Sequence, residues 1–110
     1  MKQEILEYIQ QYRGVTFVEL EKLLGDAVKG EGLLVMTDYP NIVLWDCVNE
    51  EFIATIRELL TEKKIVAKPT VLLTYLIDGK MLRLPIAKKC YPYKTLRWLP
   101  IVFNPAELCS

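Results

Sequence analysis

The strongest local signal in the sequence is the run Thr16-Phe17-Val18-Glu19, which lies between two apolar segments. A threonine followed three residues later by a glutamate is typical of a capping box, in which the hydroxyl caps a helix and the carboxylate reaches back to the cap. A glycine just beyond the last apolar position is typical of a helix end. The run therefore predicts a helix over Phe17–Leu24, with Thr16 as its N-cap and Gly25 at its end.

Apolar residues at helical spacing predict two further helices. Residues 2–12 carry one apolar stripe opposite polar side chains, and Gly14 follows it. Residues 50–63 carry another, and Asn49 before it is a favoured N-cap residue. The stripes consist of Ile5, Tyr8, Ile9 and Tyr12 in the first helix and Phe52, Ile53, Ile56, Leu59 and Leu60 in the second.

Two short apolar runs in the middle of the chain predict a β-hairpin. Residues 33–37 and 42–47 flank the turn-forming sequence Asp-Tyr-Pro-Asn. The glycine-rich residues 25–32 before them are expected to form a loop. After the third helix, residues 65–66 are expected to be extended.

A second hairpin is predicted further along the chain. Residues 71–77 and 80–84 flank Asp78-Gly79, a dipeptide typical of two-residue hairpin turns with positive φ at the glycine. Residues 99–103 are expected to add a last strand, at a sheet edge because of Pro100.

The order helix, capped helix, hairpin, helix, hairpin resembles the winged helix-turn-helix superfamily. The stretch from Ile5 to Leu24 and the run of residues 59–66 carry this resemblance, which covers about residues 2–84. It implies that the second hairpin is the wing and the first hairpin an insert. We therefore expect a single α+β domain over residues 1–110, a winged helix-turn-helix-like fold with an inserted β-hairpin and an extra C-terminal strand segment.

Three short runs are similar to small proteins of staphylococcal prophages and pathogenicity islands. They are Gly14-Val15-Thr16-Phe17-Val18-Glu19, Tyr75-Leu76-Ile77-Asp78-Gly79-Lys80 and Trp98-Leu99-Pro100. This resemblance implies an origin in a phage or another mobile genetic element, and it implies no activity.

The residue types argue against catalysis. The chain has no histidine, so it lacks the commonest general base and the commonest metal ligand. Gly25, Gly30 and Gly32 lack the Lys-Ser/Thr that follows a phosphate-binding loop, and no cysteine or acidic pair has zinc spacing. We expect a non-enzymatic protein with no catalytic residues, no metal site and no cofactor.

The three cysteines show no paired motif. Cys47, Cys90 and Cys109 are expected to be reduced, with Cys47 buried because it ends an apolar run. No apolar run approaches the roughly 20 residues that a membrane span needs, and the N-terminus lacks a signal-peptide core. We therefore expect a cytoplasmic protein that does not contact a membrane.

Charge is distributed unevenly along a chain whose net charge is zero. Residues 1–56 carry four basic and ten acidic side chains, a net charge of −6, whereas residues 57–98 carry ten basic and three acidic ones, a net charge of +7. This asymmetry favours a polyanionic partner for the second half. It is equally consistent with two halves that attract each other.

Basic and aromatic residues interleave in the last third of the chain. Cations contact phosphates and aromatic rings stack on unpaired bases, which together suit single-stranded nucleic acid. The alternative is a solvated basic loop whose rings, including Trp98, pack on the core. The candidate nucleic-acid-binding residues are Lys80, Arg83, Lys88, Lys89, Tyr91, Tyr93, Lys94 and Arg97.

The third helix is a weaker candidate for base recognition. In winged helices this helix usually enters the major groove, and its predicted surface here includes Thr55, Arg57 and Thr61. However, Glu50 and Glu51 occupy the end that would contact bases, where they would repel phosphates. They are also explained by the helix dipole alone.

Two functions from different classes fit these observations. The first is a nucleic-acid-binding accessory or regulatory protein of a phage or mobile element, which acts through the wing and the basic tail. The second is a protein-interaction module that binds or inhibits a host or phage protein through its winged-helix surface. The superfamily often dimerises, so a homodimer is a further expectation, although no heptad seam is visible.

Overall fold

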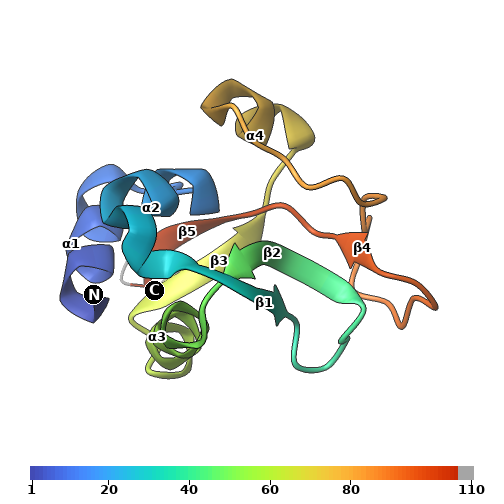
Figure 1. The fold of residues 1–110 in the computed structure, drawn as a ribbon, viewed down its shortest axis with the longest axis horizontal. Coiled ribbons are helices and arrows are strands. Elements are labelled where there is room, and N and C mark those ends of the chain that lie inside the picture. Colours follow the sequence, from blue (N-terminus) through green and yellow to red (C-terminus); the bar gives the residue numbers. More distant parts are fainter. Residues whose placement is uncertain (107–110) are drawn as a thin grey trace.

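The computed structural model describes residues 1–106, which form a mixed α+β fold (Figure 1). The α+β class predicted from the sequence is therefore confirmed. The elements in chain order are α1 (Lys2–Tyr12), α2 (Phe17–Leu24), a 3-10 turn η1 (Gly25–Val28), β1 (Lys29–Val35), β2 (Ile42–Val48), α3 (Glu50–Thr61), β3 (Ile65–Pro69), α4 (Leu72–Asp78), β4 (Arg97–Trp98) and β5 (Ile101–Pro105).

The predicted N-caps of α2 and α3 are confirmed. The Thr16 hydroxyl accepts a hydrogen bond from the Glu19 amide at 3.2 Å, and the Asn49 side chain accepts one from the Phe52 amide at 2.8 Å. The Glu19 carboxylate does not complete the capping box as expected. It accepts a hydrogen bond from the Tyr8 hydroxyl at 3.2 Å, which ties α2 to α1.

The first predicted hairpin is also confirmed, with a longer first strand. β1 pairs antiparallel with β2, and the short β4 adds a parallel third strand. β1 already begins at Lys29, inside the glycine-rich segment predicted as a loop. Glycine is needed there because a Cβ at Gly30 would lie 2.6 Å from the Cα of Asn49. The glycines therefore mark a close approach of two backbones.

β3 and β5 form a second, antiparallel sheet, with Ala67 opposite Phe103. Val15, in the link between α1 and α2, makes an isolated antiparallel bridge to Phe103. The last strand expected over 99–103 begins two residues later, at Ile101. It pairs with the extended chain that was expected after the third helix.

The second predicted hairpin, over 71–84, is wrong. Residues 72–78 form the helix α4, and Gly79 ends it in the left-handed region with φ +93°. The positive φ expected at Gly79 is confirmed, but as a helix C-cap. Short apolar runs do not distinguish a strand from a helix by periodicity. Here Tyr75 is fully buried and Leu72 half-buried, while Leu73 between them is exposed, which is a helical spacing.

Residues 70–97, which we call the excursion, leave the β3–β5 sheet after β3 and reach the other sheet at β4, beside β2. In Figure 1, α4 lies at the top of the view, apart from the other helices. Thr70 donates its amide to the Pro100 carbonyl at 2.9 Å, so the start of this segment is held beside the chain that follows β4. The wing expected at 71–84 is replaced by this segment.

An aromatic cluster joins the elements at the centre of the molecule. Phe17 stacks on Trp45 with ring centroids 5.6 Å apart, and Trp45 in turn contacts Tyr75 at 5.4 Å and Trp98 at 6.1 Å. All four rings are fully buried. Trp98 thus belongs to the core. This is the position that the alternative interpretation of the basic and aromatic residues predicted.

The prediction that Cys47 is buried is wrong. It lies near the irregular end of the β1–β2 ladder with φ +56°, and its side chain is exposed, as is that of Cys90. Both thiols are free, and Cys109 lies outside the described residues. Within residues 1–106, no helix is long and apolar enough to cross a membrane.

Candidate nucleic-acid interface

The candidate binding residues 88–97 lie in one loop that is closed at its base. The Ala87 amide donates to the Trp98 carbonyl and the Trp98 amide donates to the Pro85 carbonyl, both at 2.8 Å. Ile86 and Trp98 also form a parallel bridge. We call residues 88–97 the basic loop. The buried Trp98 ring fixes the base of this loop to the core.

Three cation–π and aromatic contacts form a row within the basic loop. The Lys89 ammonium lies 5.2 Å from the centre of the Tyr91 ring, and the Tyr91 and Tyr93 rings meet edge to face at 5.2 Å. The Arg97 guanidinium lies 4.5 Å from the centre of the Tyr93 ring. We call these four residues the aromatic–cation row. Such contacts orient the rings and cations relative to one another.

Two hydrogen bonds hold the row against the β1–β2 turn. The Asn41 side chain donates to the Tyr93 carbonyl at 2.8 Å, and the Arg97 amide donates to the Asn41 carbonyl at 2.8 Å. Tyr93 and Arg97 are half-buried, whereas Tyr91 is 49% exposed. The row thus has a fixed inner half and an accessible outer half.

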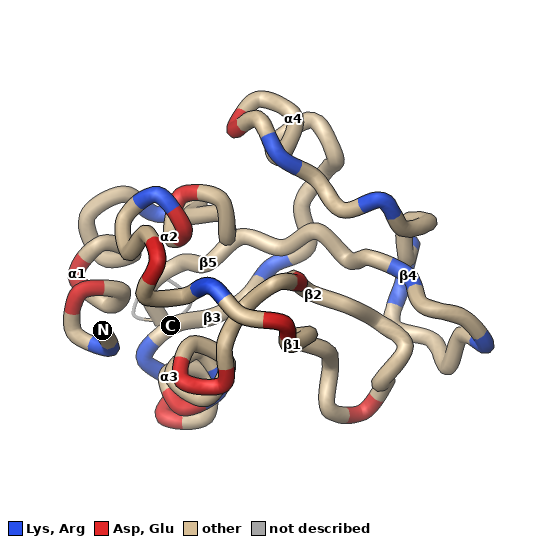
Figure 2. Tube along the Cα trace, in the orientation of Figure 1, with Lys and Arg blue, Asp and Glu red and all other residues tan. Residues whose placement is uncertain are grey.

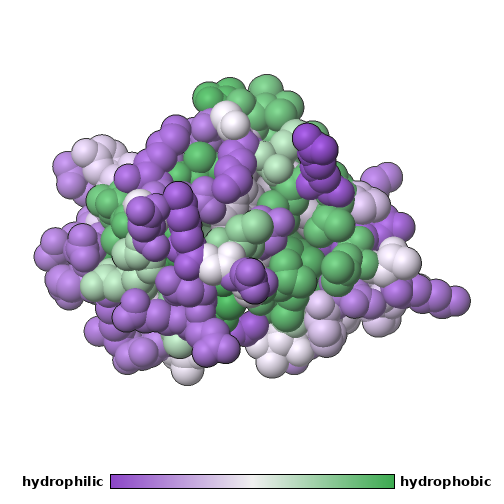
Figure 3. All heavy atoms as spheres, in the orientation of Figure 1, coloured by the Kyte–Doolittle hydropathy of each residue, from purple (hydrophilic) through white to green (hydrophobic). Residues whose placement is uncertain are grey.

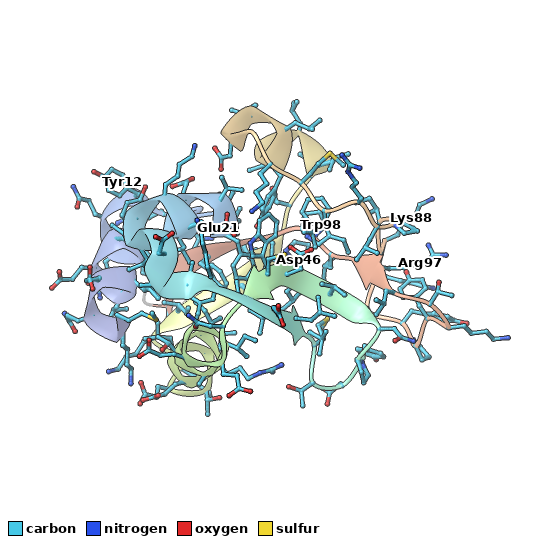
Figure 4. All side chains as sticks on the ribbon, in the orientation of Figure 1. Tyr12, Glu21, Asp46, Lys88, Arg97 and Trp98 are labelled. Atoms are coloured by element: carbon cyan, nitrogen blue, oxygen red, sulfur yellow. The ribbon has the colours of Figure 1, made fainter. Side chains whose placement is uncertain are left out.

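Three lysines of the basic loop are exposed around this row. Lys88, Lys89 and Lys94 have no ion-pair partner within residues 1–106. Figure 2 shows the basic segments that follow the chain from α4 to β4, and Figure 4 places Lys88 and Arg97 beside β4. The structure therefore brings six of the eight predicted cations and rings into one surface loop, with Tyr93 and Arg97 beneath the other four.

Lys80 does not belong to this group. Its ammonium binds the Glu21 carboxylate at 3.0 and 3.3 Å and lies 5.6 Å from the centre of the Trp45 ring. Arg83 is exposed and lies between α4 and the basic loop in sequence. The predicted strip is thus divided, because Lys80 holds the end of the α4 segment to α2.

The predicted surface of the third helix is wrong at Thr55, is only half-exposed at Arg57, and is confirmed at Thr61. Thr55 is only 9% exposed, and its hydroxyl donates to the Glu51 carbonyl at 2.7 Å. The Arg57 guanidinium donates to the Val35 carbonyl at 2.8 Å and to the Thr37 hydroxyl at 3.0 Å, so it fastens α3 to β1. Thr61 is exposed as expected.

The exposed face of α3 is acidic and is partly neutralised by α1. The Lys2 ammonium contacts both Glu58 and Glu62. Hydrogen bonds to these carboxylates raise the pKa of Lys2, and the bond to Lys2 lowers the pKa of Glu62. A helix with such a face is poorly suited to follow a phosphate backbone.

A groove of about 700 Å³ between α2, the start of β1 and the end of α4 was not predicted from the sequence. Its carboxylates hold elements together. Glu21 accepts hydrogen bonds from the Trp45 indole at 2.8 Å and from Lys80, and Asp78 accepts one from the Thr16 hydroxyl at 2.6 Å. Contacts between residues about 60 positions apart leave no local pattern, so sequence reasoning had no signal for this groove.

The described residues contain no group of three or more His, Cys, Asp or Glu side chains that could hold a metal ion. Comparisons with protein-family models, with curated proteins and with solved structures found no match to this chain.

Proposed function

We propose that this protein is a non-enzymatic nucleic-acid-binding accessory or regulatory protein, of phage or mobile-element origin, that binds through its basic loop. The observation that carries the proposal is the aromatic–cation row, in which an exposed Tyr91 is flanked by Lys88, Lys89 and Lys94. A positively charged track with an accessible ring is the arrangement that single strands require.

The charge distribution supports the same surface. Within residues 1–106, Lys80–Glu21 is the one ion pair that joins a candidate binding cation to the acidic first half of the chain. Attraction between the acidic and basic halves of one chain therefore leaves the lysines of the loop unpaired within residues 1–106. Those cations are available for phosphate contacts.

We further propose that the fold is a winged-helix variant with a different wing from the one predicted. β3 follows α3 directly and pairs antiparallel with β5, and Val15 between α1 and α2 adds a bridge to β5. In this interpretation β3 and β5 are the strands of the wing, and the excursion is inserted between them. The basic loop then projects from the wing side of the domain.

Single strands are favoured over base recognition in a duplex groove. Glu50 and Glu51 open α3, and the two predicted polar contacts Thr55 and Arg57 are used within the fold. Recognition by a helix in the major groove needs polar side chains that are free to reach base edges. The basic loop has no such helix and instead offers a ring for stacking.

Fluorescence anisotropy with a labelled oligothymidine, titrated at several salt concentrations, tests the proposal. Each phosphate contact contributes about −0.7 to the log–log salt slope for single strands, so three or four contacts give roughly −2 to −3. Changing Lys88, Lys89 and Lys94 together to Ala should flatten this slope. Tyr91→Ala should weaken binding by about 1–3 kcal/mol, because it removes a stacking ring, whereas Tyr91→Phe should retain it.

A matched control is the triple change of Lys63, Lys64 and Lys68 to Ala, which removes the same charge outside the basic loop. It should lower the affinity much less than the loop variant. Equal loss in both variants, or no binding to single or double strands at low salt, would refute the proposal. A protein captured through Glu50, Glu51 and Glu58 but not through the lysines would favour the protein-interaction module instead.

A further inference from the structure

The outer face of α4 exposes an unusual number of large apolar side chains. They are Val71 (67% exposed), Leu73 (60%), Leu76 (51%), Ile77 (75%) and Met81 (40%), and we call them the α4 ridge. Figure 3 shows hydrophobic atoms gathered over α4 at the top of the view. A contiguous apolar patch on a water-exposed surface marks an interaction site more often than isolated apolar residues do.

The inward face of the same helix explains why α4 is fixed in this orientation. Tyr75 is fully buried, and its hydroxyl donates to the Ile101 carbonyl at 2.6 Å. Asp78 at the end of the helix accepts a hydrogen bond from Thr16, and its carbonyl accepts one from Lys22. The ridge is therefore presented to solvent by a helix that is anchored on its opposite side.

We propose that the α4 ridge is the contact between two copies of this chain, related by a twofold axis. No charged residue lies between Lys68 and Asp78, the stretch that carries every ridge residue except Met81, so this part of the ridge is uncharged and self-complementary, as a twofold contact requires. The whole chain also carries no net charge, so two copies do not repel each other at long range.

The charge asymmetry of the chain selects one orientation of the pair. Figure 2 shows most acidic segments on α1, α2 and α3, and basic segments along the chain from α4 to β4, with α4 between the two regions. A twofold axis that reverses the long direction of the molecule places the acidic region of each copy over the basic region of the other. A twofold axis parallel to the long direction would instead place the two acidic regions over each other and the two basic regions over each other, where like charges repel.

The small area of the ridge indicates that the charged regions beside α4 also take part in the dimer contact. A stable interface buries about 800 Å² per partner. A large aromatic side chain buries about 150–250 Å², and each partly exposed aliphatic side chain of the ridge buries less. The five ridge residues together therefore supply roughly half of the 800 Å². The remainder comes from the charged regions beside α4, so the dimer should weaken as salt rises.

Sedimentation equilibrium of the full chain tests the dimer, with reductant present so that Cys47 and Cys90 cannot link two copies. The apparent mass should rise with concentration from the 12.8 kDa of one chain towards twice that value. Leu73→Glu and Ile77→Glu should each weaken dimerisation by about tenfold or more, because they place a carboxylate in the contact on both copies. Leu33→Glu is the matched control. It changes an apolar residue that is 44% exposed on β1, and it should leave the dimer intact.

Several outcomes would overturn the proposal. One is a monomer at every concentration up to about 0.5 mM, where a dimer with a Kd as weak as about 1 mM would still be detected. Another is a dimer that both ridge variants leave unchanged. A monomer that binds anionic vesicles or another protein through the ridge would also overturn it. A dimer whose affinity does not fall with salt would refute the orientation. Because the dimer places the acidic region of one copy over the basic loop of the other, Ile77→Glu should bind oligothymidine at least as tightly as the unchanged chain. Loss of the dimer with binding retained, and loss of binding with the dimer retained, therefore distinguish failure of this proposal from failure of the proposed function.

Discussion

The helical body, formed by α1, α2, α3, β3 and β5, and the excursion treat apolar residues in opposite ways. In the body the largest apolar side chains, such as Phe17, Phe52 and Phe103, are fully buried. In the excursion, Leu73, Leu76 and Ile77 point to solvent, although Leu82 is buried. Apolar content alone therefore does not decide burial here, because only one side of the excursion, with Tyr75, Leu82 and Ala87 at its centre, packs on the rest of the molecule.

Tyr75 is the principal attachment of the excursion. Its ring packs edge to face on Trp98 at 5.1 Å, and its hydroxyl accepts a hydrogen bond from the Phe17 amide at 3.3 Å while donating to Ile101. Burial raises the pKa of this hydroxyl well above its ordinary value, so it stays a protonated donor. One residue thus connects α4 to α2, to the aromatic cluster and to β5.

The largest effect is expected from Tyr75→Ala. Removing a buried aromatic side chain costs about 3–5 kcal/mol of the free energy of unfolding, and it also leaves the Phe17 amide without its partner. Leu73→Ala on the same helix should change stability by less than about 0.5 kcal/mol, since that side chain is exposed. Urea unfolding measures both values at low protein concentration. Similar losses in the two variants would show that the two faces of α4 do not differ.

A smaller effect is expected from Thr16→Ala. The Thr16 hydroxyl caps α2 and also donates to Asp78 of α4, so its loss should cost about 1–2 kcal/mol. Thr16→Ser keeps the hydroxyl and should be nearly neutral. A double-mutant cycle with Asp78→Ala should reveal a coupling of about 0.5 kcal/mol or more. Additive losses would mean that Thr16 acts within the body alone.

The smallest effect is expected from Gly79→Ala. A Cβ at Gly79 meets no heavy atom within 4 Å, so the cost is conformational, about 1 kcal/mol for a side chain with φ +93°. Gly79→Asn should cost less, because asparagine tolerates this region. Amide hydrogen exchange should become faster in α4 and stay unchanged in α1 and α3. Faster exchange throughout the molecule would show that the excursion and the body unfold together.

Local sequence is enough to predict the elements whose first residues form their own caps or turns. Thr16 and Asn49 predicted the starts of α2 and α3, because a capping side chain bonds to an amide three residues away. The turn at 38–41 similarly predicted the pairing of β1 with β2. In each case the decisive contact joins near neighbours, so it is visible in a short stretch of sequence.

Tertiary structure decided the conformation of residues 71–84 and the surface that they form. A seven-residue apolar run is compatible with a strand and with a helix. In the helical conformation Tyr75 is buried against Trp45 and Trp98. The same kind of contact removed Lys80 from the predicted strip, through Glu21, and Arg57 from the surface of α3, through Val35. These partners lie more than 20 residues apart in sequence, so local pattern carries no trace of them, whereas packing brings them within hydrogen-bond distance.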